Sequence, residues 1–200
     1  MDKLLFVDKK KYLIYGNNVS FIFSTTEIEK DELNINFNSS SILLNECEDI
    51  LRKEYSVPED KPFIILKIET TNNNTNYMNS YYEIHNPYNF SEKLNLDICQ
   101  NKTIEIRAPI QMKKYHLDLI NTVKNLGYNI FDLNDPFYTD ICTVFSYNNS
   151  DISLSERRNL LNLSNEIYCM HNCNFTNIDI NTMRSICQCN ANYSELNNNE

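Results

Sequence analysis

The sequence predicts an α+β fold: an antiparallel β-sheet or sandwich with one packed helix, followed by a small disulfide-rich region. Short apolar or alternating runs, separated by turns rich in Asn and Pro, are typical of antiparallel strands. One stretch around residue 47 has apolar residues at helical spacing. Four of the seven cysteines fall between residues 169 and 189, and such crowding indicates covalent or metal-bound sulfur.

The segments expected to form strands lie in the first half of the chain. Residues 19–23 are largely apolar, and residues 33–37 alternate as a half-buried strand does. Residues 63–69 are almost continuously apolar, which favours a central strand. Residues 81–84 and 103–107 complete the expected sheet.

Three helices are expected. The first is the packed helix that precedes Pro58, and the second covers residues 111–127, with Gly127 where a C-terminal cap belongs. Ser153 and Glu156 have the spacing of a capping box, which predicts a short helix through Leu161. The apolar face of the first helix consists of Leu43, Leu44, Cys47, Ile50 and Leu51.

These elements divide the chain into three parts. Residues 1–110 are expected to form the β-rich domain with one helix, and residues 111–165 a connecting helix and a turn-rich segment. Residues 166–200 are expected to form a separate cysteine-rich end that continues beyond this sequence.

Composition limits the classes of function. The chain has 200 residues and 42% hydrophobic residues, enough for a packed core, and its net charge of −9 argues against a nucleic-acid partner. Its apolar runs are too short for a signal-peptide core or a membrane span. We therefore expect contact with a membrane only through flanking sequence that is missing here.

The cysteines permit three interpretations. They could be reduced and buried, or Cys173, Cys187 and Cys189 could bind zinc together with His171. The spacings C-x3-C and C-x-C depart from the C-x2-C loops of tetrahedral zinc sites. The favoured interpretation is disulfide bonding in an oxidising compartment.

The order C-x3-C and then C-x-C resembles the middle of an EGF-like module. That resemblance implies the pairs Cys142–Cys173 and Cys169–Cys187, and it leaves Cys189 unpaired, awaiting a cysteine beyond Glu200. Outside the module, Cys47 and Cys99 remain as a pair that ties the helix to the sheet. The cysteines expected in disulfides are thus Cys47, Cys99, Cys142, Cys173, Cys169 and Cys187.

A wider resemblance covers most of the chain from about residue 40. Its stretches, at residues 45–55, 82–87, 94–99, 135–142 and 151–158, are similar to the cysteine-rich, membrane-proximal ectodomain of large surface proteins in AT-rich protists. The resemblance implies an exposed, non-catalytic segment and supplies no functional residues.

Asparagine-linked glycosylation is a further expectation. The chain holds nine Asn-x-Ser/Thr sequons, which are acceptors only in a secreted protein, although an AT-rich codon bias also raises their number. The candidate acceptors are Asn18, Asn38, Asn73, Asn89, Asn101, Asn148, Asn162, Asn174 and Asn192.

Two further sites are weighed against simple structural explanations. Asp132, Asp135 and Asp140 are oxygen donors of the kind that bind calcium, but Asp-Pro also initiates turns. The pair Phe137–Tyr138 either packs over a disulfide or anchors a partner. The other oxygen donors near this candidate calcium site are Asn134 and Asp151.

The chain is not expected to be an enzyme. It contains no nucleophile-elbow, dinucleotide or phosphate-loop motif, and His85, His116 and His171 have no metal-ligand spacing. In the favoured interpretation no cofactor is expected other than the candidate calcium ion.

The favoured function is a non-catalytic structural or adhesion segment of a cell-surface protein. We expect it on the extracellular face of the plasma membrane or in the secretory lumen. Its expected partners are other extracellular domains of the same chain or other surface proteins. The alternative is a cytosolic or viral protein with reduced cysteines that forms a small zinc-binding module.

Overall fold

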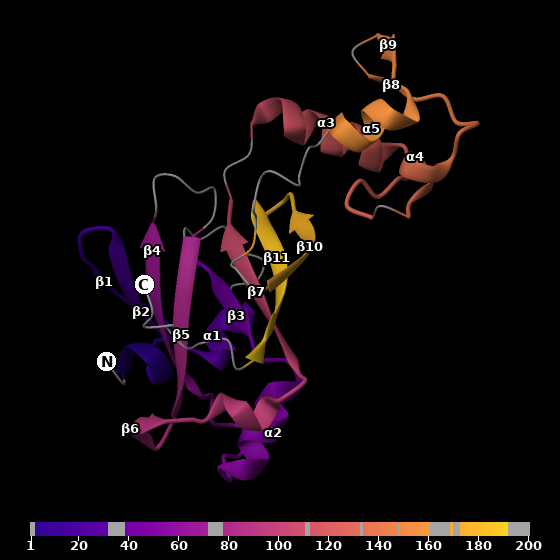
Figure 1. Ribbon diagram of the computed structural model, residues 1–200. Helices are drawn as coiled ribbons and strands as arrows, with labels where there is room; N and C mark the ends of the chain where they lie inside the picture. The colour runs from indigo at the N-terminus through magenta and orange to yellow at the C-terminus, as the bar shows by residue number, and fades with distance from the viewer. Residues whose placement is uncertain are drawn as a thin grey trace, which may run out of the picture. The chain divides into compact units, whose positions relative to one another are not determined.

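The computed structural model divides the chain into two compact units, Met1–Ile110 with Tyr168–Glu200, and Gln111–Ile167 (Figure 1). The expected strand at residues 33–37 lies outside the described residues. The residues described are 3–31, 39–71, 78–110, 113–132, 134–147, 149–160, 169 and 173–191.

The larger sheet of the first unit has five antiparallel strands in the order β1-β2-β4-β5-β6. The strand β4 lies in the middle, as the continuous apolar run predicts. The strands expected at residues 19–23 and 81–84 are β2 and β5. The bounds are β1 Tyr12–Tyr15, β2 Val19–Thr25, β4 Ile64–Thr71, β5 Met78–Asn86 and β6 Asn89–Lys93.

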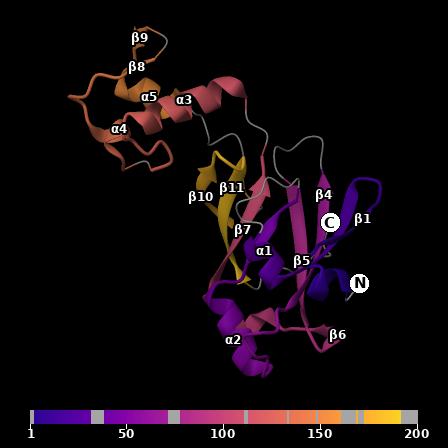
Figure 2. The ribbon, with the colours of Figure 1, turned by 180° about the vertical axis from the view of Figure 1, so that it is seen from behind.

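The second sheet has four strands, in the order β10-β11-β7-β3. These are β10 (Cys173–Asp179), β11 (Arg184–Asn190), β7 (Thr103–Pro109) and β3 (Ser41–Leu43). Figures 1 and 2 show the C-terminal hairpin of β10 and β11 beside β7.

This pairing corrects the expected division of the chain. Residues 166–200 were expected to form an end of their own, but β11 pairs with β7 from Arg184–Pro109 to Asn190–Thr103. Backbone hydrogen bonds along that whole ladder make the hairpin part of the first unit.

The packed helix of the first unit is α2 (Glu46–Glu54). Its residues Cys47 and Leu51 are fully buried, in agreement with the predicted apolar face, whereas Leu43 lies in β3 and Leu44 precedes the helix. Three short turns of helix accompany it: η1 (Lys3–Val7), α1 (Thr26–Asp31) and η3 (Leu96–Cys99).

The core of the first unit lies between the two sheets. Ile65 on β4 and Ile84 on β5 are fully buried and belong to one cluster with Ile104 and Ile106 on β7. The helix α2 contributes Leu51 to the same cluster. The fold is therefore α+β with antiparallel sheets and a disulfide-rich region, as predicted.

A buried ionic cluster joins the two sheets at one side of this core. Lys67 on β4 and Glu29 on α1 are both fully buried, and the Lys67 Nζ lies 3.0 Å from Glu29 Oε1. Lys67 also donates to the carbonyl of Ser40, and Glu29 Oε2 accepts the backbone N–H of Ile42 at 3.0 Å. The pair therefore holds the chain on both sides of Ser41, where β3 begins.

A second carboxylate of the larger sheet extends this cluster. Glu69 on β4 accepts the backbone N–H of Ser40 at 2.8 Å and its hydroxyl at 2.5 Å. The Ser40 hydroxyl lies 3.0 Å from that of Ser80 on β5. Two strands of the larger sheet, β4 and β5, thus contact Ser40, the residue that precedes β3 of the smaller sheet.

In its described residues, the second unit contains three helices and a small hairpin. The helix α3 (Lys114–Asn125) is the one predicted for residues 111–127. Gly127 has the expected left-handed conformation, with φ of 88°. The N–H of Gly127 donates to Lys124, and that of Tyr128 to Val123, as in a Schellman motif. The other elements are α4 (Pro136–Thr139), α5 (Leu154–Leu160), β8 (Ser146–Tyr147) and β9 (Ser150–Asp151).

The predicted capping box is present at the start of α5. The N–H of Ser153 donates to Glu156 Oε2 at 2.8 Å, and the N–H of Glu156 donates to Ser153 Oγ at 3.4 Å. These two bonds satisfy backbone donors that the first turn of a helix leaves open.

The substitution Lys67→Met tests the ionic cluster. It leaves the carboxylate of Glu29 buried without its nearest cation, so we expect the free energy of unfolding to fall by about 3–5 kcal/mol. Urea unfolding followed by circular dichroism measures the loss. Lys9→Met is the matched control, because the Lys9–Glu27 pair is exposed, and it should leave stability unchanged. An equal loss in both variants would contradict this account.

Acid should weaken the same cluster. Burial by itself would raise the pKa of Glu29, but the ammonium groups of Lys67 and Lys11 bring it below the ordinary value of 4.5. The stabilisation is therefore complete above pH 4.5 and is lost as pH falls through the lower folded-state pKa. Urea unfolding at several pH values should show a smaller acid loss in Glu29→Gln than in the wild type. Glu54→Gln, at an exposed carboxylate near the end of α2, should not reproduce that difference of slope.

Candidate functional site

The sulfur atoms form three disulfides, all in the first unit: Cys47–Cys99, Cys169–Cys187 and Cys173–Cys189. The first joins α2 to η3, with a Cα–Cα distance of 5.3 Å, as expected for a pair that ties the helix to the β-rich domain. Cys169–Cys187 is also one of the expected pairs. These cysteines are bonded to each other, so they are not the thiolate ligands that a zinc site needs.

The pairing implied for Cys142 is wrong. Cys173 lies directly opposite Cys189 in the β10–β11 ladder, and these two form the third disulfide. Cys187 and Cys189 are two residues apart on one strand, so both side chains face the core. The unpaired thiol is therefore that of Cys142, which is exposed, and not Cys189. The pattern implied by the EGF-like resemblance is not the one present.

The candidate calcium ligands accept hydrogen bonds within their own turns. Asp132 accepts the N–H of Asn134, Asp135 accepts the N–H groups of Phe137 and Asn129, and Asp140 accepts the N–H of Cys142. Within the described ranges, no group of three or more His, Cys, Asp or Glu side chains is placed to hold a metal ion. These contacts favour the turn interpretation, and calcium binding remains an untested prediction.

The candidate glycosylation sites are accessible where the structure describes them. Asn18, Asn89, Asn101 and Asn174 are all exposed. The other candidates, Asn38, Asn73, Asn148, Asn162 and Asn192, lie outside the described residues, as does His171.

The aromatic pair of the second unit is buried. Phe137 makes an edge-to-face contact with Phe145 at 4.9 Å, and Tyr138 donates to the carbonyl of Ile130 at 2.6 Å. Arg157 lies over the rings of Phe137 and Phe145. Phe137 and Tyr138 therefore pack in the interior of the unit, as one of the two interpretations proposed. They pack against aromatic rings and an arginine and not over a disulfide, because Cys142 is unpaired.

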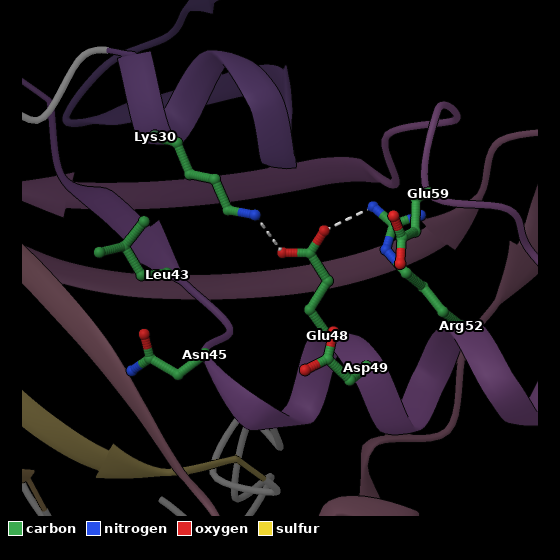
Figure 3. A pocket seen from close by; sticks show the side chains of 7 residues that line it. All are labelled: Lys30, Leu43, Asn45, Glu48, Asp49, Arg52 and Glu59. Atoms are coloured by element: carbon green, nitrogen blue, oxygen red, sulfur yellow. Dashed lines mark hydrogen bonds and ion pairs between the residues drawn. The ribbon is translucent and has the colours of Figure 1, made fainter.

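A polar pocket of about 480 Å³ lies between α1, α2 and the loop after α2 (Figure 3). The carboxylate of Glu48 points into it between two cations, with Lys30 Nζ at 2.9 Å and an Arg52 nitrogen at 2.5 Å. The residues that line it are Lys30, Leu43, Asn45, Glu48, Asp49, Arg52 and Glu59.

The groups in this pocket are already engaged with one another. Burial by itself would raise the pKa of Glu48, but hydrogen bonds from Lys30 and Arg52 bring it below its ordinary value, so the carboxylate is a poor base. Arg52 also donates to the carbonyls of Pro58 and Lys61 and lies 4.9 Å from the centre of the Phe63 ring. The pocket thus fastens α2 to its neighbours and has little capacity left for chemistry.

The outer face of the five-stranded sheet, turned away from the core, is the stronger candidate. Two rows of side chains cross it. One row runs Tyr12–Phe23–Leu66, and the other runs Ile14–Phe21–Ile68–Tyr81. The opposite face of the same strands carries the buried side chains of Ile22, Lys67 and Tyr82. We call the two rows the outer apolar face.

Much of the outer apolar face is accessible. Tyr12 is 39% exposed, Ile14 46% and Phe21 36%, while Leu66 and Ile68 are half-buried. Exposed apolar side chains that lie next to one another on a sheet in this way typically mark a contact site.

Polar groups border the outer apolar face on β5 and β6. Glu83 accepts from Tyr81 at 2.8 Å and from Lys93 at 3.0 Å, and it lies 3.2 Å from His85 Nε2. The ring of His85 stacks on Phe90 at 5.2 Å. An apolar centre with a polar, aromatic border has the composition of a protein-binding surface.

The sequence interpretation missed this surface, although a signal exists. In an antiparallel sheet with one wet face, strands alternate polar and apolar residues. Residues 21–23 are Phe, Ile and Phe without a polar residue between them. That run means that both faces of β2 are apolar, and one of them is left without a covering sheet.

Thiol chemistry tests the disulfide framework. We expect one reactive thiol per chain, at Cys142, both in the native state and after denaturation without reductant, because the other six cysteines are bonded. A thiol assay with Ellman's reagent measures this number. Cys142→Ser should remove the signal, whereas Cys47→Ser should add the thiol of Cys99. Seven thiols in the denatured wild type would refute the framework.

No helix in the described part of the chain is long and apolar enough to cross a membrane.

Comparison with known proteins identifies no relative of this chain. The chain matches no known family model, no curated protein and no solved structure.

Proposed function

We propose that the chain is a non-catalytic, extracellular module of a cell-surface protein, with a structural or adhesive role. The observation that carries the proposal is the outer apolar face, held on a five-stranded sheet whose inner side a buried ionic cluster joins to the smaller sheet, where two of the disulfides lie. Rigid strands present side chains for contact at little cost in conformational entropy.

The three disulfides support an oxidising compartment for this module. A closed loop of about 50 residues, as between Cys47 and Cys99, stabilises a fold by about 4 kcal/mol through restriction of the unfolded chain. The exposure of the four described sequons agrees with glycosylation in the secretory pathway.

The cellular location can be tested by labelling intact cells that produce the protein. A membrane-impermeant amine reagent should modify the chain without permeabilisation, because its lysines would face the medium. Removal of N-linked glycans should lower its mass in electrophoresis. Labelling only after permeabilisation would contradict the proposal.

An adhesive role predicts a defined mutational effect. Beads coated with the chain should bind to the cells that produce it, and the double variant Phe21→Ser/Ile68→Thr should reduce bead binding by about tenfold, because it removes central apolar contacts. Tyr88→Ser is the matched control, since Tyr88 is an exposed aromatic residue in the β5–β6 turn. Equal binding by all three proteins would exclude the outer apolar face as the contact surface.

A further inference from the structure

The strand β1 forms an edge of the five-stranded sheet and pairs only with β2 in the described part of the chain. Its four residues, Tyr12, Leu13, Ile14 and Tyr15, are 39%, 39%, 46% and 76% exposed. Apolar side chains are therefore open to solvent on both faces of an edge strand. Such an edge is a template for pairing with another strand.

The other edges of the two large sheets carry features that prevent such pairing. The edge strand β6 contains Glu92 and Lys93 and has a register shift near Asn86. The edge strand β10 is also interrupted by a register shift, and β3 has only three residues. Charges, bulges and short length are the usual protection of sheet edges. The strand β1 has an uninterrupted register and no charged residue.

The backbone of β1 determines which groups are available. Gly16 donates to the carbonyl of Val19 at 2.8 Å, which makes these two a hydrogen-bonded pair at the end of the hairpin. Because such pairs alternate along an antiparallel ladder, Ile14 and Tyr12 direct their backbone groups toward β2. The N–H and C=O groups of Leu13 and Tyr15 therefore point outward from the edge.

We propose that β1 is a self-association site, at which a second copy of this chain pairs antiparallel with Leu13 opposite Leu13 of the second copy. A two-fold axis perpendicular to the sheet requires that paired residues share a face. This register meets that requirement, because Tyr12 lies opposite Ile14 of the second copy, and both belong to the outer apolar face. The two five-stranded sheets join into one.

The charges near the strand are compatible with this occupant. In the proposed register, Lys10 lies opposite Gly16 of the second copy and Lys9 lies opposite its Asn17. No two like charges face each other, although each chain carries a net charge of −9. The two rows of the outer apolar face continue across the junction, so pairing extends one apolar surface over both copies. The inference does not depend on the cellular location proposed above.

The first test is the mass of the deglycosylated Cys142→Ser chain, which cannot dimerise through a thiol. Sedimentation velocity at increasing concentration should show a reversible dimer. Leu13→Lys should raise its Kd at least about tenfold, because two ammonium groups then meet at the two-fold axis. Ser91→Lys, at the exposed edge strand β6, should leave the Kd unchanged. At a concentration well below the Kd, where all three proteins are monomeric, circular dichroism should show the same melting temperature for both variants and the parent.

Two results of this test overturn the proposal. One is a monomer at every concentration up to about 1 mM. The Kd for self-association would then be above about 1 mM, too weak for a specific contact. The other is a dimer that Leu13→Lys does not weaken, or that Ser91→Lys weakens equally, since its contact would lie elsewhere. If the chain is monomeric but binds a synthetic extended peptide at β1, the occupant is a foreign strand, and the proposal of a second copy fails.

The second test addresses the register. In the Cys142→Ser background, Leu13→Cys should form an intermolecular disulfide under mild oxidation by air and copper, because the two positions are opposite. Tyr15→Cys should not, because two Tyr15 residues lie four positions apart along the strands, about 13 Å. Equal or faster linkage through Tyr15→Cys would reject the proposed register. If these tests fail, the labelling and bead experiments on the proposed function can still be interpreted. Those two experiments measure exposure at the cell surface and binding to cells, and neither depends on whether the free chain forms a dimer.

Discussion

The buried ion pair between Glu29 and Lys67 is the contact on which the packing of the two sheets depends. Lys67 comes from the inner face of the larger sheet, and Glu29 comes from α1 at the end of β2. Together they hold backbone groups of Ser40 and Ile42, so the chain enters β3 in a single register. Apolar contacts alone would not impose that register, because they are not directional.

Such a cluster has an energetic cost as well as a structural benefit. Two charges removed from water lose several kcal/mol each of hydration, and their attraction offsets this only when hydrogen bonds satisfy the remaining atoms. Here the N–H of Ile42 and the carbonyl of Ser40 supply two of those bonds, and Glu29 Oε1 faces the ammonium groups of Lys67 and Lys11. The cluster therefore selects one arrangement of the sheets, while the disulfides disfavour the unfolded chain.

Apart from one end, where Leu5 and Ile28 pack with Ile64 and Phe23, these constraints leave the outer side of the larger sheet free for other purposes. The ionic cluster and the two disulfides of the C-terminal hairpin all lie on the side where the sheets meet or within the smaller sheet. The outer apolar face and the edge of β1 have no part in that packing. The proposed adhesive role and the proposed self-association use two adjacent parts of this one surface. A continuous sheet formed by two copies would present both outer apolar faces on the same side.

Local patterns of the sequence predicted local structure. The central strand β4, the helix α2, the cap at Gly127 and the capping box at Ser153 each depend on residues within a few positions of one another. The pairing Cys47–Cys99 was also expected. In contrast, neighbouring cysteines could pair in several ways, and the EGF-like resemblance implied Cys142, not Cys189, as the partner of Cys173.

Only the tertiary structure decided the rest, because the responsible contacts are distant in sequence. The hydrogen bonds of β10 to β11 place Cys189 opposite Cys173, those of β11 to β7 join this hairpin to the first unit, and Cys142 lies in the other unit. The apolar run at residues 21–23 indicated two apolar faces, but only the position of the second sheet shows which one is covered. By itself, the sequence determined the fold class, the ends of several elements and the presence of disulfides. Knowledge of the fold was required for the partners of the cysteines, the buried pair of Glu29 and Lys67 and the exposed face. Each of them joins segments that lie apart in the sequence, and no local pattern indicates that these segments meet.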